Sequence, residues 1–311
     1  MKQVFRVFWG CTLAAALALT GCGRGGAPGS SGAGSMSGSG SGAMSGGTAG
    51  QEQAWRTGLG VVTEAAGSDR AGKITTAAAA VVLDADGKLA DVMLDELELS
   101  VSGGSTGSVT TPEDVRSKRT KGKDYPLAAA SSLGKGWAEQ ADWFADYLTG
   151  RTPDEVKKLK TDENGKPQDA DLVSGCTIAV DRYRDAVVRA CEQAKALGAA
   201  QGDRATLSLI AADLPQDLAA TDDQDAHVQA DITLAALTVD SSGRVTSAIG
   251  DMTEPELTVS ADGTVSALRE PVYTKNELGD RYGMRSASAL GKEWYEHSAG
   301  WCGYLKGKNA V

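Results

Sequence analysis

The sequence has few of the residues that build metal, haem or disulfide sites. Its 311 residues include two histidines, His227 and His297, and five cysteines, and no Cys-x-x-Cys run occurs. Histidines without partner spacing argue against a metal centre, and the cysteine spacing signals neither a haem site nor a disulfide framework. No Ser-His-Asp order and no P-loop spacing emerges either. We therefore expect no resident metal and no catalytic triad.

Positive charge and long apolar runs are also scarce. The chain has 41 acidic and 31 basic residues, which gives a formal net charge of -10. This balance argues against nucleic acid as a partner and against a basic face that docks on membranes. The apolar run at residues 7–19 is shorter than the roughly 20 residues that span a bilayer. The composition is that of an acidic, exported globular protein.

The N-terminus has the pattern of a cleaved export signal. Lys2 and Arg6 supply positive charge ahead of the apolar run, and Leu-Thr-Gly-Cys follows at residues 19–22. This stretch resembles the bacterial lipobox, in which leucine and two small residues precede a cysteine. The resemblance implies a signal peptide at residues 1–21 and a diacylglycerol on the Cys22 thiol. An ordinary secretory signal, in which the cysteine is incidental, is the alternative.

Residues 22–54 are predicted to be the lipidated cysteine and a flexible tether. Residues 23–50 are almost entirely Gly, Ser and Ala, which cannot bury enough apolar surface to offset the entropy of ordering. Random-coil scaling gives a typical reach of about 30 Å, and full extension gives roughly 90 Å. We expect the protein on the outer face of the cytoplasmic membrane, lipid-anchored and extracellular.

An internal repeat organises the rest of the chain. Residues 118–152 align without gaps on residues 275–309, with about a third of the positions identical. Both copies contain the run Leu-Gly-Lys-x-Trp. We expect two domains, 55–200 and 201–311, with a boundary near residues 198–203.

Each repeat is predicted to be an antiparallel sheet followed by helices. Residues 73–83 and 90–101 are β-like runs joined at Asp86-Gly87, a hairpin signal, and matching runs lie at 228–239 and 245–252. Apolar residues at helical spacing predict helices within 133–148, 180–197 and 290–305. Strands followed by helices in two tandem repeats predict the α+β class.

The second repeat is shorter than the first. The first continues beyond Thr152 to Leu197, whereas the second stops at Val311, the position equivalent to Asp154. Either the gene product is a fragment, or the second unit is incomplete by design.

The candidate functional motif lies in the segment that the first repeat has and the second lacks. Residues 171–177, Asp-Leu-Val-Ser-Gly-Cys-Thr, precede its last predicted helix. They resemble the flavinylation motif of FMN-binding domains, which occur in flavin subunits of sodium-pumping quinone reductases and in extracellular flavin lipoproteins. The resemblance implies FMN joined by a phosphoester to Thr177, installed by a separate flavin transferase from FAD. By position, Asp171 opens the motif, and Ser174 and Gly175 form the loop before the acceptor.

The residue types suit this chemistry. A phosphoester needs an accessible hydroxyl, which Thr177 supplies, and Gly175 leaves the backbone open to a transferase and a bulky nucleotide. A hydroxyl just ahead of the helix near Val180 lies close to free backbone N–H groups, which favour a phosphate. The alternative is that residues 174–177 are merely a loop and helix cap.

Cys176 departs from the family, which usually has alanine there. One interpretation is a small buried packing residue, and the other is a redox thiol paired with Cys191.

Two functions compete. The leading hypothesis is a membrane-anchored extracellular flavoprotein that carries covalent FMN and relays electrons from a membrane quinone reductase or similar donor to an extracellular acceptor. Such a protein is an electron-transfer carrier rather than a bond-making catalyst, so no general acid or base is expected. The alternative is a non-redox lipoprotein with degenerate FMN-binding-like domains that binds a solute or partner.

Other features are given structural interpretations. Trp137, Trp143, Trp294 and Trp301 are spaced as helix core residues, with flavin-stacking platforms as the alternative. The stretch 84–87, Asp-Ala-Asp-Gly, is interpreted as a hairpin turn, because the further acidic ligands of a calcium loop are missing.

Overall fold

The computed structural model describes residues 54–268 and 270–310. The predicted signal peptide, the Cys22 lipid site and nearly all of the tether lie outside the described residues. Residues 54–309 belong to one compact unit. Within the described part of the chain, no helix has the length and apolar character needed to cross a membrane.

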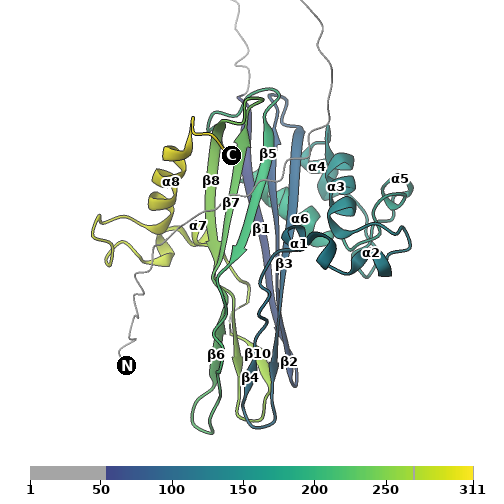
Figure 1. Ribbon diagram of the computed structural model, residues 1–311. Helices are drawn as coiled ribbons and strands as arrows, with labels where there is room; N and C mark the ends of the chain where they lie inside the picture. Colours follow the sequence, from purple (N-terminus) through teal and green to yellow (C-terminus); the bar gives the residue numbers. More distant parts are fainter. Residues whose placement is uncertain (1–53, 269, 311) are drawn as a thin grey trace, which may run out of the picture. The chain divides into compact units, whose positions relative to one another are not determined.

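The first half begins with an antiparallel sheet in the order β1-β2-β3-β4 (Figure 1). Its strands are β1 (Arg56–Gly67), β2 (Ala71–Leu83), β3 (Leu89–Gly103) and β4 (Val109–Thr110). Strand β2 pairs with β1 and β3 along its whole length, so it is the buried centre of the sheet. Its small and β-branched side chains alternate between the two faces and are fully buried on both.

The second half contributes six further strands. The strands β5 (Arg204–Ala211), β7 (Ile232–Val239) and β8 (Val245–Thr253) form a sheet in the order β5-β7-β8. The strands β6 (Ala226–Gln229), β9 (Glu256–Val259) and β10 (Val265–Ala267) form a sheet in the order β10-β9-β6. The predicted run 228–239 is therefore broken between β6 and β7, and the Ala230 N–H at this break donates to the Pro255 carbonyl.

Helices follow the strands in both halves (Figure 1). The first half has α1 (Lys118–Lys121), α2 (Leu127–Ala130), α3 (Trp137–Leu148), α4 (Pro153–Lys157), α5 (Ala170–Val173) and α6 (Asp181–Glu192). The second has α7 (Lys275–Leu278) and α8 (Trp294–Leu305). Two 3₁₀ turns, η1 (Gly122–Asp124) and η2 (Gly279–Tyr282), follow α1 and α7. The predicted α+β class is confirmed.

Two apolar cores hold these layers together. One lies between the sheets and joins side chains of both halves, among them Val61, Leu97, Leu209, Leu234 and Leu257. The other lies between the opposite face of the first sheet and the helices α3 and α6. The first sheet is thus covered on both faces, which explains why β2 is apolar on both sides.

A chain of hydroxyl groups also crosses from one half to the other. Thr57 Oγ1 lies 2.5 Å from Ser247 Oγ, which lies 2.7 Å from Thr238 Oγ1. Thr238 Oγ1 is 2.7 Å from Thr246 Oγ1, and Thr246 donates to the Asp203 carboxylate at 2.6 Å. Asp203 lies at the predicted domain boundary, so this chain of buried contacts crosses that boundary. The division into two domains stays a prediction.

The predicted hairpin at Asp86-Gly87 is confirmed, and its turn chemistry recurs. Asp84 Oδ1 accepts the N–H groups two and four residues further on, at 2.9 and 2.8 Å, and Gly87 has a φ of +78°. Asp162 and Asp240 make the same pair of bonds in their own turns. These carboxylates are engaged by the backbone, as an Asx turn requires.

Corresponding buried acids anchor the first helix of each half. Asp95 accepts the Arg119 N–H at 3.1 Å, and Asp251 accepts the Asn276 N–H at 3.0 Å. Each carboxylate is 3% exposed, which leaves it almost no contact with water. Burial is the main cause that raises the pKa of both, to about 6 for Asp251. The tandem repeat stays a prediction, but these positions have the same environment.

The buried Asp251 predicts a specific pH dependence of stability. Its pKa of about 6 exceeds the ordinary 3.8, so the folded protein binds this proton more tightly than the unfolded chain. The resulting stabilisation is complete below about pH 4 and is lost as the pH rises through 6. The free energy of unfolding should therefore fall across this window by on the order of 3 kcal/mol from this group.

Urea unfolding at a series of pH values measures this effect. Asp251→Asn should flatten the slope between pH 4 and 6, because the titrating group is gone. Asp86→Asn, at an exposed turn position, is the matched control and should keep the wild-type slope. Equal slopes for wild type and Asp251→Asn would contradict the assignment.

Candidate functional site

Thr177 lies in the loop between α5 and α6, where it is partly exposed. It borders a cleft of about 500 Å³. The cleft is lined by residues that include Leu127, Ser131, Ser132, Lys166 and Ile178. The predicted acceptor hydroxyl is thus at the rim of a concave site that combines apolar side chains, hydroxyls and one amine.

The Thr177 hydroxyl is held by a glutamine of α3. Gln140 Oε1 accepts both the Thr177 N–H, at 2.9 Å, and the Thr177 hydroxyl, at 3.1 Å. Gln140 is fully buried, and its amide nitrogen donates to Ser131 Oγ and to the Lys135 carbonyl, both at 3.0 Å. Gln140 was not predicted from the sequence, although a polar residue on the apolar stripe of a helix is a usable signal.

Gly175 is covered by a tryptophan, so its backbone is not open to a ligand as the sequence had suggested. A Cβ at this position would lie 2.1 Å from the Trp143 ring, far inside van der Waals contact. The Lys135 amine also lies over this indole, 4.7 Å from the ring centroid. Because the indole covers Gly175, only a residue without a side chain lets α3 pack closely against the motif loop.

The opening residues of the motif are exposed and shape the short helix α5. Ser174 Oγ donates to the Asp171 carbonyl at 2.7 Å. Asp169 is the N-cap of α5, and its Oδ1 accepts the N–H groups of Asp171 and Leu172 at 3.0 and 3.3 Å. Asp169 was not predicted from the sequence, although the preference for Asp at N-caps points to it.

Cys176 is fully buried, as a packing residue would be, and Cys191 is 5% exposed. Both thiols are free in the structure, so no disulfide joins them. Burial raises the pKa of Cys176 to about 11 and that of Cys191 to about 12. A thiolate is therefore disfavoured at either position, and the structure favours the packing interpretation over the redox pair.

The beginning of α6 has mixed electrostatics. No side chain caps this helix, whose N-cap is Val180. Asp181 Oδ1 accepts the Arg182 N–H at 2.9 Å and adds negative charge at the helix end. Since that charge opposes an anion, the cation beside Thr177 that suits a phosphate is Lys166 in the cleft.

The four tryptophans differ in burial. Trp137 is 2% exposed and donates to the Tyr183 hydroxyl at 3.1 Å, so its core prediction is confirmed. Trp294 is half-buried. Trp143 and Trp301 are 41% and 47% exposed, so the core prediction was wrong for them. Trp143 lies outside the buried stripe of α3, and Trp301 occupies the place in α8 that Phe144 occupies in α3.

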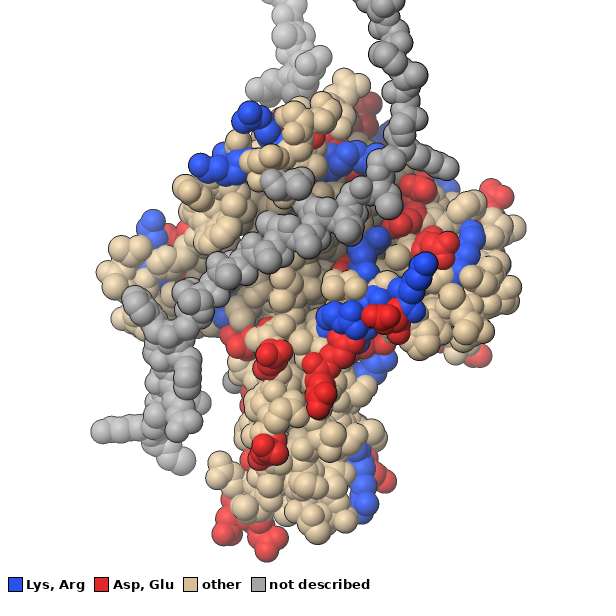
Figure 2. Space-filling view, viewed as in Figure 1, with Lys and Arg blue, Asp and Glu red and all other residues tan. Residues whose placement is uncertain are grey.

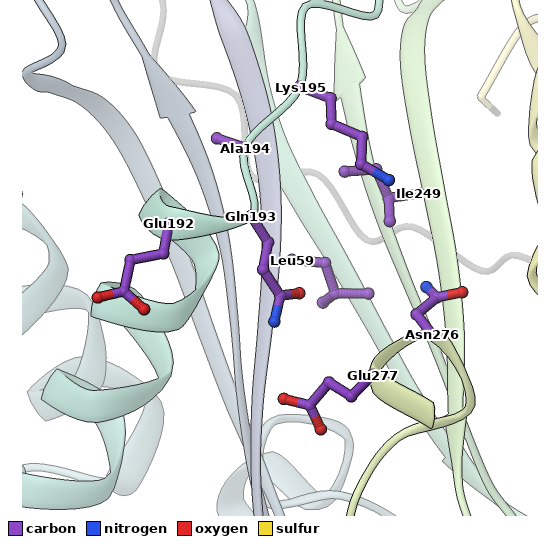
Figure 3. Close-up of a pocket in the computed structure, with 8 residues that line it drawn as sticks. All are labelled: Leu59, Glu192, Gln193, Ala194, Lys195, Ile249, Asn276 and Glu277. Carbon is purple, nitrogen blue, oxygen red and sulfur yellow. The ribbon is translucent and has the colours of Figure 1, made fainter. Parts of the chain in front are cut away.

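A second pocket, of about 400 Å³, lies between the two halves (Figure 3). Leu59 of β1 and Ile249 of β8 provide apolar side chains. The polar side chains of Gln193 and Glu277 point into the pocket from opposite sides (Figure 3). The Glu277 carboxylate already accepts the Thr274 N–H at 2.9 Å and lies 3.5 Å from Arg189. This pocket contains none of the motif residues.

Charges of both signs are mixed on the face of the molecule shown in Figure 2. On the face shown in Figure 2, acidic and basic side chains are interspersed, and acidic ones gather toward the lower end. Such mixing gives no extended field of one sign on this face.

The site around Thr177 offers a held hydroxyl, an amine and a partly apolar cleft, and it groups Ser174, Gly175, Cys176 and Thr177 in one short loop. These groups can accept and hold a phosphate-bearing ligand with an apolar part. Comparisons of this chain with protein-family models, curated proteins and solved structures find no match.

Proposed function

We propose that this chain is a membrane-anchored extracellular flavoprotein that carries FMN on Thr177 and relays electrons from a membrane donor to an extracellular acceptor. The observation that supports it is the partly exposed Thr177 hydroxyl, held by Gln140 at the rim of the cleft. A hydroxyl that served only as a helix cap would bond to the first turn of α6. Thr177 instead bonds to α3, and the N-cap of α6 is Val180.

The cleft residues fit a flavin nucleotide in kind and size. A volume of about 500 Å³ lies within the range of small-molecule sites. Lys166 would bind the phosphate, and Leu127 and Ile178 would contact the apolar part of the ligand. Ser131 and Ser132 supply hydroxyls for its polar groups. When bound, FMN supplies one- and two-electron redox chemistry.

Attachment would be a balanced phosphoryl transfer from FAD. The Thr177 oxygen forms a new bond to phosphorus, the pyrophosphate bond of FAD breaks, and AMP leaves. The hydroxyl proton passes to a base of the transferase. The electron relay itself needs no general acid or base in this chain, so the absence of a catalytic triad in the sequence is compatible with the proposal.

The anchor would set where the carrier works. A lipid on Cys22 and a tether with a typical reach of about 30 Å would keep the folded unit near a membrane donor such as a quinone reductase. A covalent bond would also prevent loss of FMN by dilution outside the cell.

Mass spectrometry after co-expression with a flavin transferase tests the proposal. The wild-type chain should gain the mass of one FMN, and Thr177→Ala should gain none. Thr161→Ala, a partly exposed threonine on a neighbouring loop, is the matched control and should be modified fully. An unmodified wild-type chain, or modification that persists in Thr177→Ala, would refute the flavin proposal.

The pocket between the halves is the observation that favours the alternative function, a solute-binding lipoprotein. It would bind a small molecule with an apolar part against Leu59 and Ile249. An unmodified wild-type chain would make this the function to pursue.

A further inference from the structure

Gln140 is a buried amide whose orientation is fixed by its neighbours. Both hydrogens of an amide nitrogen need acceptors, and here they are Ser131 Oγ and the Lys135 carbonyl, each at 3.0 Å. With the nitrogen so placed, Oε1 is the atom that faces Thr177. A flipped amide would set its N–H groups against the Thr177 N–H, and the Oε1 against the Lys135 carbonyl, so one orientation is strongly preferred.

This arrangement restricts the Thr177 hydroxyl. Oε1 accepts hydrogen bonds and donates none, so the hydroxyl hydrogen points at it over a distance of 3.1 Å. The N–H of the same residue also donates to Oε1, at 2.9 Å, which fixes the backbone beside the hydroxyl. One of the three staggered positions of the threonine side chain is therefore selected.

We propose that Gln140 is the positioning residue for phosphoester formation at Thr177. This inference rests on the proposed flavin function. The bond from the Thr177 N–H to Gln140 keeps the Thr177 oxygen in one place at the cleft. The hydroxyl hydrogen leaves Gln140 for the transferase base as the new bond to phosphorus forms. Gln140 takes no proton, because a neutral amide is a very weak base, so its contribution is orientation. A preoriented nucleophile reacts faster than one that samples several rotamers.

The contact also sets the order of events. Gln140 and Thr177 are 37 residues apart in sequence, so their bond exists only when α3 and the motif loop have packed together. The folded protein is therefore the substrate of the transferase, and the heptapeptide motif by itself is not sufficient. Flavinylation follows folding.

The second half has a similar contact between a helix side chain and a serine, but with histidine in place of glutamine and, in the part of the chain that the structure describes, with no threonine bonded to it. His297 of α8 occupies the place of Gln140, and its Nε2 lies 2.9 Å from Ser288 Oγ, as Gln140 lies beside Ser131. Among the described residues, none bonds to the other ring nitrogen of His297 in the way Thr177 bonds to Gln140. One flavin per chain is therefore expected.

The experiment compares Gln140→Met and Gln140→Glu in the full-length chain. Purified protein is incubated with transferase and FAD, and the mass gain is followed with time. In parallel, hydrogen exchange of the Thr177 amide is measured on the unmodified protein. Gln140→Met has the same length and no acceptor, so modification should slow by roughly 10- to 100-fold and amide exchange should accelerate. Gln140→Glu keeps an acceptor oxygen for Thr177, and burial favours its protonated form, whose O–H can donate to the Lys135 carbonyl, so it should restore both toward wild type.

The outcomes separate the two proposals. Wild-type modification rates in a folded Gln140→Met would overturn the positioning role, and so would slow modification of a folded Gln140→Glu whose Thr177 amide stays protected. If Gln140→Met does not fold, Gln140→Glu and the exchange measurement still decide. If the wild-type chain gains no FMN, the flavin proposal fails. The exchange data then still show whether Gln140 holds Thr177.

Discussion

Replacing Gly60 with valine is expected to separate helix α6 from strand β1 and to lower the free energy of unfolding by about 4 to 5 kcal/mol. A Cβ at Gly60 would lie 2.0 Å from the Ala186 carbonyl oxygen. Gly58 has the same relation to Ala190, at 1.9 Å. Both contacts are with backbone atoms, which no rotamer change can move away. The helix would have to leave the sheet, and its buried face would be exposed.

Urea unfolding of Gly60→Val against wild type measures this loss. Gly300→Ala is the matched control, because a Cβ there meets nothing within 4 Å. It should be neutral or stabilise by up to about 1 kcal/mol, since alanine is the better helix former. A Gly60→Val protein of wild-type stability would show that α6 is not seated on β1 as described.

Removing the amine of Lys118 should cost about 3 to 5 kcal/mol, because it leaves a carboxylate buried without its cation. Lys118 Nζ lies 2.5 Å from Glu96 Oε1 and 3.2 Å from Glu98 Oε1. The Glu96 side chain is 2% exposed, so water cannot replace the lost partner. In the second half, Lys275 pairs with Glu254 at 2.7 Å, but that carboxylate is 28% exposed.

The two halves therefore supply a comparison within one chain. Lys118→Met should destabilise strongly, whereas Lys275→Met should cost about 1 kcal/mol, as expected for a pair that water can reach. The double variant Glu96→Gln with Lys118→Met should recover much of the loss, because no unpaired charge remains. Equal effects of the two lysine substitutions in denaturant titrations would contradict the role of burial.

Local sequence patterns predicted the elements that they determine. The alternation and the Asp86-Gly87 turn predicted β2, β3 and their hairpin, and the apolar spacing located α3, α6 and α8 to within a few residues. Thr152, followed by proline and Glu155, forms a capping box, which is also set by the local sequence. These features depend on neighbours in the chain, so the sequence alone is sufficient.

Features that depend on distant contacts were missed. Strand β1 has glycines at Gly58 and Gly60, which weaken a strand pattern and are explained only by the helix packed upon them. Strand β5 has Thr206 and Ser208 at the positions that correspond to Gly58 and Gly60. Thr206 and Ser208 pair with Leu237 and Ala235, just as Gly58 and Gly60 pair with Val81 and Ala79. These side chains would keep a helix from lying as close as α6 does.

The candidate site shows the same division. The motif placed Thr177 ahead of a helix, and the structure has it there. Gln140 and Lys166 approach it from other segments of the chain, so no local pattern could pair them with Thr177, although Gln140 is recognisable as a polar residue on the apolar stripe of its helix. The exposed Trp143 was misassigned because helical spacing alone does not show which side of a helix meets the sheet.

The interior shared by the two halves has a consequence for synthesis. The first sheet is complete once residue 110 has emerged, yet one of its apolar faces is covered by strands that begin at Arg204. A chain held half-finished would present that face, with the β-prone run of β2, to other chains. If the protein is exported as proposed, transport as an unfolded, full-length chain would avoid this hazard, because both faces of the first sheet can then be buried in one event.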